Sequence, residues 1–204
     1  NFCTNILTLA GAVPDRNGEI FVTYAVTQGQ FGYLNAMRVT TTNYPTSASS
    51  YLSLANRWTD QQALGAEPTG AVVFFGSSSI RRWESLTRDF SDYQVIQRGM
   101  GGAVFSDINQ LLDQVVAIHQ PRAVVLWAGV NDLYAYQSAD TVFQKFTEFV
   151  TTFTNQLPSA KLFYLGIPKN PEFAGTPSRD TERTNVNARI ASFMQTNGNS
   201  NLHY

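Results

Sequence analysis

The sequence predicts an α/β protein with three layers, in which helices cover both faces of a parallel sheet. From Gly70 onward, short apolar runs alternate with segments of ten or more residues that have helical periodicity. The run Ala71–Phe75 shows no alternation of polar and apolar residues, which is typical of a strand buried on both faces. Strands that are joined through helices pair in parallel by right-handed crossovers, so one parallel sheet is expected.

The individual elements follow from their periodicities. The expected strands are Ala71–Phe75, Gln94–Gln97, Ala123–Trp127, Leu162–Leu165 and Leu202–Tyr204. Between them, apolar residues recur every three or four positions, which predicts amphipathic helices. These stripes run from Ile108 to Val116, from Val142 to Phe153 and from Val186 to Met194, and a shorter helix is expected to begin near Ile80. We expect Ala71–Phe75 and Ala123–Trp127, the two most apolar strands, to be neighbours at the centre of the sheet.

The first part of the chain has a different pattern. Residues 1–45 contain apolar runs that resemble short strands, separated by a strong turn signal at Pro14–Gly18. Three short strands are marginal alone, so this β-rich segment is expected to pack on the main domain or to belong to a larger module. A linker at 45–50 precedes an amphipathic helix that starts at Tyr51, and the α/β domain is expected over 50–204.

Composition and charge exclude several functional classes. The chain has 204 residues and a net charge of -1, which does not suit nucleic acid or an anionic membrane surface. No apolar run approaches the length of a membrane span. Only 14% of residues are charged, and the polar surface is rich in Thr, Ser, Asn and Gln, which predicts a secreted or periplasmic protein. Cys3 is the only cysteine, so an internal disulfide is impossible, and no cluster of ligand residues predicts a metal or another cofactor.

Three loops bring polar groups to the carboxyl edge of the predicted sheet, where sites of such folds lie. The first loop contains the serines of Gly76–Ser79, the second is glycine-rich and ends at Gly102, and the third contains Asn131. A serine at a strand-to-helix turn can act as a nucleophile, and a glycine N–H with an asparagine amide can stabilise an oxyanion. Alternatively, the serines cap the helix and Asn131 is a turn residue. The glycine spacing is not that of a dinucleotide-binding loop.

These three loops resemble the conserved blocks of the SGNH hydrolases, also called GDSL esterases and lipases. FFGSSSIRRW resembles the first block in the GSSS branch, VIQRGMGGAVFSDI the second and WAGVNDL the third. The resemblance spans Tyr51–Tyr204 and implies a flavodoxin-like α/β/α fold. It implies that Ser78 is the nucleophile, with Ser77 in the place of the family's aspartate, and that Gly102 and Asn131 donate to the oxyanion together with the Ser78 N–H. Gln97 stands where asparagine is usual.

The general base is the part of the family pattern that is not found. The family supplies it from a D-x-x-H block, and this chain contains two histidines, His119 and His203. His119 is expected at the amino edge of the sheet, and His203 has Ser200, not aspartate, three residues before it. The resemblance therefore implies that the sequence stops before its base, and that a missing C-terminal segment or a partner chain completes the site. His203 remains a less favoured candidate base.

The sequence thus predicts a serine ester hydrolase that acts on short acyl or acetyl esters, including those of carbohydrates. The 204-residue chain alone is expected to hydrolyse esters weakly, because a serine without its base is a poor nucleophile. The alternative is a noncatalytic structural or carbohydrate-binding protein on a degenerate scaffold of the same family. A flavodoxin-like phosphate-binding protein is a more distant alternative, which predicts affinity for flavin or nucleotide.

Overall fold

The computed structural model describes residues 48–65 and 67–204. The β-rich segment predicted over 1–45, together with Cys3 and the first half of the linker predicted at 45–50, lies outside the described residues. The second half of that linker is instead helical, because the helix predicted to start at Tyr51 begins at Ala48. In the part that is described, no helix is long and apolar enough to span a bilayer.

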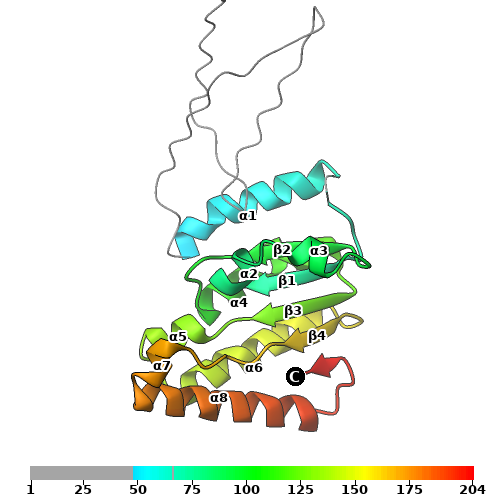
Figure 1. Cartoon of the computed structure of the whole chain (residues 1–204). Coiled ribbons are helices and arrows are strands. Elements are labelled where there is room, and N and C mark those ends of the chain that lie inside the picture. The colour runs from blue at the N-terminus through cyan, green and yellow to red at the C-terminus, as the bar shows by residue number, and fades with distance from the viewer. Residues whose placement is uncertain (1–47, 66) are drawn as a thin grey trace, which may run out of the picture. The chain divides into compact units, whose positions relative to one another are not determined.

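The described chain is built on one five-stranded parallel sheet with the order β2-β1-β3-β4-β5 (Figure 1). The strands are β1 Val72–Gly76, β2 Val95–Gly99, β3 Ala123–Trp127, β4 Lys161–Tyr164 and β5 Leu202–His203. All five lie within two residues of their predicted bounds. The predicted central pair is confirmed, because β1 and β3 are hydrogen-bonded neighbours and each has a further strand on its other side. This strand order is the flavodoxin-like one.

The larger apolar core lies on one face of the sheet, under four long helices. They are α1 Ala48–Ala63, α4 Phe105–Val115, α6 Ala139–Gln156 and α8 Pro177–Thr196. The sheet contributes every second side chain of its strands to this core, as Val124 and Leu126 of β3 do. The apolar stripes of the helices pack against them, with Ile108 and Phe146 fully buried. The three long helical stripes predicted after β2, β3 and β4 are therefore confirmed.

The opposite face is covered by two one-turn helices rather than by the single helix expected from Ile80. These are α2 Ser78–Arg81 and α3 Leu86–Asp89. They cover a small core around Phe74, on which Trp83 packs edge-on at a centroid distance of 5.7 Å. The chain turns between the two helices because the Trp83 N–H bonds to the Ile80 carbonyl, an i to i−3 pattern that ends α2.

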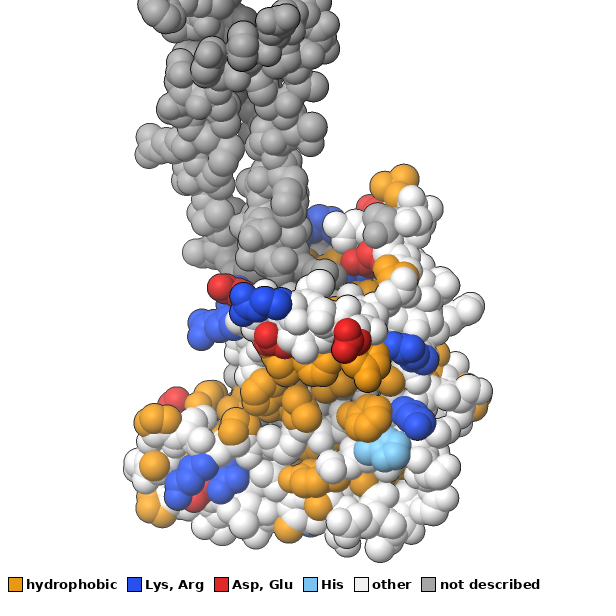
Figure 2. Space-filling model, turned by 45° about the vertical axis from the view of Figure 1, so that its right-hand side comes forward, with side chains coloured by type: hydrophobic (Ala, Val, Ile, Leu, Met, Phe, Trp, Pro, Cys, Tyr) orange, Lys and Arg blue, Asp and Glu red, His pale blue; other side chains and the backbone are white. Residues whose placement is uncertain are grey.

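The same face is more open over β3, β4 and β5. Val125, Phe163 and His203 are register partners there, and Phe163 is 37% exposed. Figure 2 shows hydrophobic side chains gathered on one side of the molecule, with a histidine side chain among them. The helical cover of this second face is thus uneven, dense over β1 and β2 and sparse over β4 and β5.

The remaining short elements lie at the two ends of the sheet. The turn η1 Ala117–His119 precedes β3, while α5 Val130–Tyr134 and α7 Pro171–Ala174 follow β3 and β4. Figure 1 shows α5 and α7 beside the tips of the strand arrows, at the carboxyl edge. The three loops that carry Ser78, Gly102 and Asn131 leave the adjacent strands β1, β2 and β3 at this edge.

Candidate active site

Ser78 is the first residue of α2, two positions after the end of β1. Ser77 is buried and its N–H bonds to the Trp127 carbonyl, whereas Ser78 is only partly buried. The turn is tight because Gly76 lies against β3, where a Cβ atom would come within 2.1 Å of the Trp127 carbonyl oxygen. The N–H groups of the first turn of a helix have no partners within the helix, so the Ser78 N–H is free to act as a donor.

The turn that contains Gly102 is anchored on both sides. Met100 donates its N–H to the Gly76 carbonyl at 2.8 Å, and the Tyr51 hydroxyl donates to the Gly101 carbonyl at 2.6 Å. Gly102 has a φ of +83°, a conformation that favours glycine, and the residue is exposed. Within the described residues, the backbone bond that closes this turn is from Ala103 N–H to the Met100 carbonyl. The Gly102 N–H is therefore not needed to close the turn.

Asn131 lies in the first turn of α5 and reaches back to the Gly102 turn. Its side-chain Nδ2 donates to the Ala103 carbonyl at 2.8 Å. An amide has two N–H donors, so one remains for another acceptor after this bond is made. The structure thus brings Asn131 to the residue that follows Gly102. Since β1 and β3 end in register, with Gly76 opposite Trp127, the loop that carries Ser78 starts beside the loop that carries Asn131.

Asp132 has a role that the sequence reasoning missed. Its carboxylate is fully buried and accepts the Phe105 N–H, at 3.2 and 3.0 Å to its two oxygens. Asn131 therefore binds the Ala103 carbonyl, and Asp132 binds the Phe105 N–H. These two groups flank Val104, the residue that joins the Gly102 turn to α4. The signal in the sequence was the adjacent Asn-Asp pair, of which only the asparagine was given a function.

The electrostatics of Asp132 follow from its burial. Removal from water raises the pKa of its carboxyl, and the Phe105 N–H and the Lys145 ammonium, 3.7 Å away, oppose that rise. The opposing groups favour the carboxylate form that accepts the Phe105 N–H. Asp132 thus links the position of α4 to the first turn of α5.

Gln97 connects β2 to α2, the helix that contains Ser78. Its Nε2 donates to the Ile80 carbonyl at 2.6 Å and to the Trp83 carbonyl at 3.0 Å. These carbonyls lie at the end of α2, where helices leave acceptors without partners. Glutamine in place of the family's usual asparagine therefore still ties this loop to β2.

His119 lies in a buried polar cluster under α1. Its ring nitrogens lie 2.9 Å from Nη2 of Arg98 and 3.1 Å from Oε1 of Gln62. Arg98, one residue beyond the predicted strand Gln94–Gln97, is a fully buried residue of β2 and forms an ion pair with Glu67. His119 precedes β3 and is at the opposite end of that strand from Asn131, as predicted.

His203 is a strand residue of β5. Its ring stacks on Phe163 with a centroid distance of 4.6 Å and an interplanar angle of 16°. Its Nε2 is buried and has no hydrogen-bond partner in the described structure. In the strand order, β3 and β4 lie between β5 and the strand that leads to Ser78. Neither histidine is brought to the serine, and among the described residues no hydrogen bond is made by the Ser78 hydroxyl.

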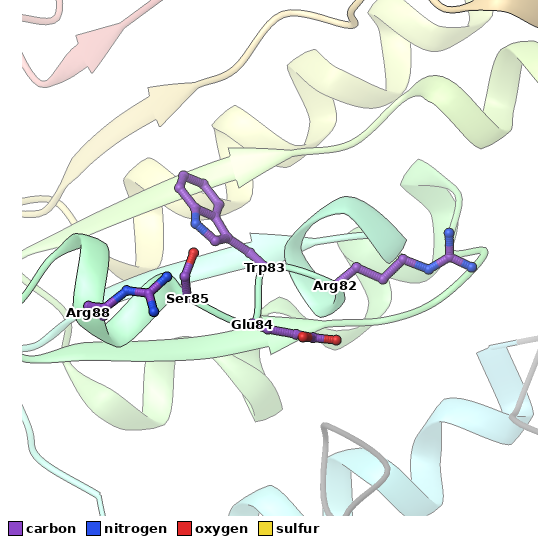
Figure 3. Close-up of a pocket in the computed structure, with 5 residues that line it drawn as sticks. All are labelled: Arg82, Trp83, Glu84, Ser85 and Arg88. Atoms are coloured by element: carbon purple, nitrogen blue, oxygen red, sulfur yellow. The ribbon is translucent and has the colours of Figure 1, made fainter.

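Two further observations concern the surroundings of α2. A hollow of about 380 Å³ lies at the connection from α2 to α3, lined by Arg82, Trp83, Glu84, Ser85 and Arg88 (Figure 3). It does not include Ser78. In the described part of the chain, no group of three or more His, Cys, Asp or Glu residues is arranged to hold a metal ion.

The comparison with family models decides the family. The model of the GDSL-like Lipase/Acylhydrolase family matches residues 53–200, which is more than half of the chain. The chain belongs to this family. The predicted membership of the SGNH, or GDSL, family is thereby confirmed, and the protein is an esterase- or lipase-type hydrolase at the level of its family. A comparison with curated proteins gives no match.

Solved structures agree on the fold. A GDSL-like lipase from Bacteroides thetaiotaomicron is 21% identical, with a TM-score of 0.59 over 70% of this chain and 74% of that one. A candidate acylhydrolase from Bacteroides fragilis is 25% identical, with a TM-score of 0.58 over 70% and 72% of the two chains. An acetyl xylan esterase, AlAXEase, is 21% identical, with a TM-score of 0.52 over 64% and 75%. At these identities the likeness concerns the fold.

Proposed function

We propose that the protein hydrolyses acetyl esters of carbohydrates through an acyl-enzyme on Ser78. The observation that carries this proposal is the bond from the Asn131 amide to the Ala103 carbonyl, which joins the loop of one oxyanion donor to that of the other. Asn131, Gly102 and the Ser78 N–H then provide three donors at the edge where β1, β2 and β3 end. Acyl transfer needs such fixed donors around the developing oxyanion.

The reaction follows from these roles. The Ser78 hydroxyl attacks the ester carbonyl, its proton passes to a base, and the carbonyl oxygen becomes an oxyanion held by the three donors. On collapse the sugar oxygen leaves with the proton from the base, and an acetyl group remains on Ser78. Water then attacks the acetyl carbonyl and gives a proton to the base, and collapse of this second intermediate releases acetate and restores the Ser78 hydroxyl. Each half-reaction needs a base, and neither His119 nor His203 is placed to serve. The proposal therefore includes a base that comes from outside the 204 residues.

The choice of an acetylated carbohydrate has two supports. One is the similarity in fold to an acetyl xylan esterase. The other is the composition of the chain, which is rich in Thr, Ser, Asn and Gln and has only 14% charged residues, because a neutral polar surface suits a carbohydrate. We also propose that the protein is exported to the periplasm or the cell exterior, where such polysaccharides occur.

The test measures hydrolysis of p-nitrophenyl acetate with and without added imidazole, which can replace a missing histidine base. We expect a low rate for the chain alone and a higher rate with imidazole, after the imidazole-only reaction is subtracted. Ser78→Ala should reduce the rate to that of imidazole alone, because it removes the nucleophile. Ser79→Ala, its neighbour in the same turn, is the matched control and should keep the rate.

Other outcomes would overturn parts of the proposal. Loss of activity in Ser79→Ala but not in Ser78→Ala would place the nucleophile one residue later. A fast rate without imidazole that His203→Ala removes would make His203 the base. No Ser78-dependent rate under any condition, including in a longer chain that carries a D-x-x-H segment, would favour the noncatalytic carbohydrate-binding alternative.

A further inference from the structure

Tyr136, which follows α5, has an unusual backbone conformation for its residue type. Its φ is +57°, and among the described residues only Gln120 shares a positive φ without being glycine. Tyr136 donates its N–H to the Leu133 carbonyl, and Gln137 donates to the Asp132 carbonyl, which is the helix-ending pattern that usually has glycine at this position. Since the side chain is 80% exposed, core packing does not explain a tyrosine here.

The tyrosine ring is held by Arg179 of α8. The guanidinium carbon lies 4.1 Å from the centroid of the Tyr136 ring and 5.9 Å from that of Tyr134. The nearest carboxylate oxygen, from Glu172, is 3.7 Å away, and the buried Nε has no hydrogen-bond partner in the described structure. Arg179 thus covers one face of the Tyr136 ring and leaves the rest of the ring to solvent.

The surface beside this pair is hollowed into a groove. A hollow of about 160 Å³ is lined by Tyr136, Ser138, Arg179 and Glu182, among others. A second hollow of about 410 Å³ shares Ser138 and Glu182 and continues along α6 and α8. Two adjoining hollows on an open surface suit an extended chain better than a small isolated ester.

The groove and the proposed oxyanion site are connected through α5. Asn131 lies in the first turn of this helix, while Leu133, two residues later, and Tyr136 line the smaller hollow. The Tyr134 hydroxyl accepts the Asn170 side-chain N–H at 2.8 Å, which ties the end of α5 to the loop after β4. A ligand whose ester group sits at Asn131 would therefore have its next units within reach of Tyr136.

We propose that Tyr136 and Arg179 form a subsite for the sugar chain of the substrate, a neutral pyranose oligosaccharide. This inference rests on the proposed function, because it names the alcohol part of the ester. The exposed phenol face packs on the C–H face of a pyranose, and the guanidinium donates to a ring or hydroxyl oxygen. A neutral sugar is preferred because Glu172 and Glu182 both lie beside Arg179 and would repel an acidic one.

The experiment measures binding of xylotetraose, a neutral pyranose chain, by calorimetric titration, and so does not depend on turnover. Tyr136→Gly should weaken binding about tenfold or more, the usual cost of losing a central aromatic contact, while the chain unfolds at the same or a higher urea concentration. Tyr136→Phe should retain binding, because the ring is kept. Arg179→Met should weaken binding as well.

Gln120→Gly is the matched control. It makes the same backbone change at the other end of the sheet, and it should leave xylotetraose binding unchanged. Tyr93→Ala tests whether any exposed tyrosine matters, because Tyr93 is 54% exposed and lies under Arg122 near the opposite edge. It should also leave binding unchanged.

The outcomes separate this inference from the proposed function. No xylotetraose binding by the wild-type chain, or equal binding by Tyr136→Gly, overturns the subsite even where Ser78-dependent hydrolysis of p-nitrophenyl acetate is present. A loss in Tyr136→Gly that appears for p-nitrophenyl octanoate and not for xylotetraose would make the ring an acyl-chain contact and would also overturn it. Sugar binding that depends on Tyr136, together with no Ser78-dependent hydrolysis even with imidazole or in a longer chain that carries a D-x-x-H segment, would support the subsite and overturn the esterase.

Discussion

The two ends of the sheet contain similar local features but differ in what joins their loops. The amino end has Gln120 in a left-handed conformation and an exposed pair of Tyr93 and Arg122, with the guanidinium carbon 5.4 Å from the ring centroid. The carboxyl end has Tyr136 in the same conformation and the closer pair of Tyr136 and Arg179, at 4.1 Å. Similar local geometry thus occurs at both ends, and the difference lies in the surroundings.

At the amino end, backbone groups bond to one another. Gly70 donates its N–H to the His119 carbonyl, Arg122 to the Ala71 carbonyl and Lys161 to the Arg122 carbonyl. The carboxyl end has backbone bonds of this kind too, such as that from the Met100 N–H to the Gly76 carbonyl, and the side chains of Asn131 and Asp132 add further connections. Side-chain groups can be placed where a ligand needs donors, whereas closed backbone bonds leave few free donors. The candidate site therefore lies at the end of the sheet where the side chains of Asn131 and Asp132 also join the loops.

Buried charge also differs between two regions of the first face. Under α1, Arg98 is paired with Glu67 and contacts His119 and the Trp58 ring, and none of these residues is proposed for catalysis. At the carboxyl edge, the buried Asp132 holds the start of α4 beside the Gly102 turn. We infer that the first group serves stability and the second positions the site, and the following predictions test this difference.

The largest change in stability is expected from Arg98→Met. It removes the buried guanidinium that pairs with Glu67 and contacts His119, which should lower the free energy of unfolding by about 4 kcal/mol. Urea denaturation followed by tryptophan fluorescence would measure it. Arg122→Met, at an exposed site of the amino end, is the control and should change stability by less than about 0.5 kcal/mol. Equal effects of the two changes would show that the cluster under α1 adds no special stability.

The largest change in rate without a comparable loss of stability is expected from Asn131→Ala. Removal of one oxyanion donor should lower kcat by about 10²–10³, measured with p-nitrophenyl acetate in the presence of imidazole. Gln62→Ala removes a hydrogen-bonding amide of the cluster under α1 instead, and should leave kcat unchanged. A similar loss in both variants would mean that kcat reports general destabilisation and not the oxyanion site.

A smaller effect is expected from glycine at the two left-handed positions. Gln120→Gly and Tyr136→Gly each relieve backbone strain, while glycine makes the unfolded chain more flexible, so each should raise the free energy of unfolding by up to ~1 kcal/mol. The two gains should be alike, because neither side chain is buried. A clear loss of stability in Tyr136→Gly alone would show that the contact with Arg179 is structural.

The smallest effect concerns the pH dependence of stability. Because burial raises the pKa of Asp132 in the folded state, its favourable contribution is complete below the unfolded value and is lost as pH rises through the folded value. The difference in unfolding free energy between wild type and Asp132→Asn should therefore fall as pH rises from about 4 to 7. A difference that grows with pH would show that the hydrogen bond from Phe105 outweighs burial.

Much of the fold could be predicted because buried strands and amphipathic helices have characteristic local patterns of apolar residues. The uninterrupted apolar runs of β1 and β3 predicted a central parallel pair, and the stripes of α4, α6 and α8 predicted their helices. The prediction of one helix from Ile80 was wrong, because α2 ends after one turn and α3 follows it. At the end of α2 the Gln97 side chain donates to the Ile80 carbonyl. That contact is between residues 17 positions apart, so no local pattern could show it.

The sequence by itself determined the fold class, the order of the strands along the chain and the family motifs around Ser78, Gly102 and Asn131. These depend on residue type and spacing, which a linear chain records directly. Only the tertiary structure decided that Asp132 holds the start of α4, that Arg98 is a buried ion-pair partner, and that Tyr136 meets Arg179. The physical reason is that each of these contacts joins residues distant in sequence, and its energy depends on burial and distance that arise after the chain has folded.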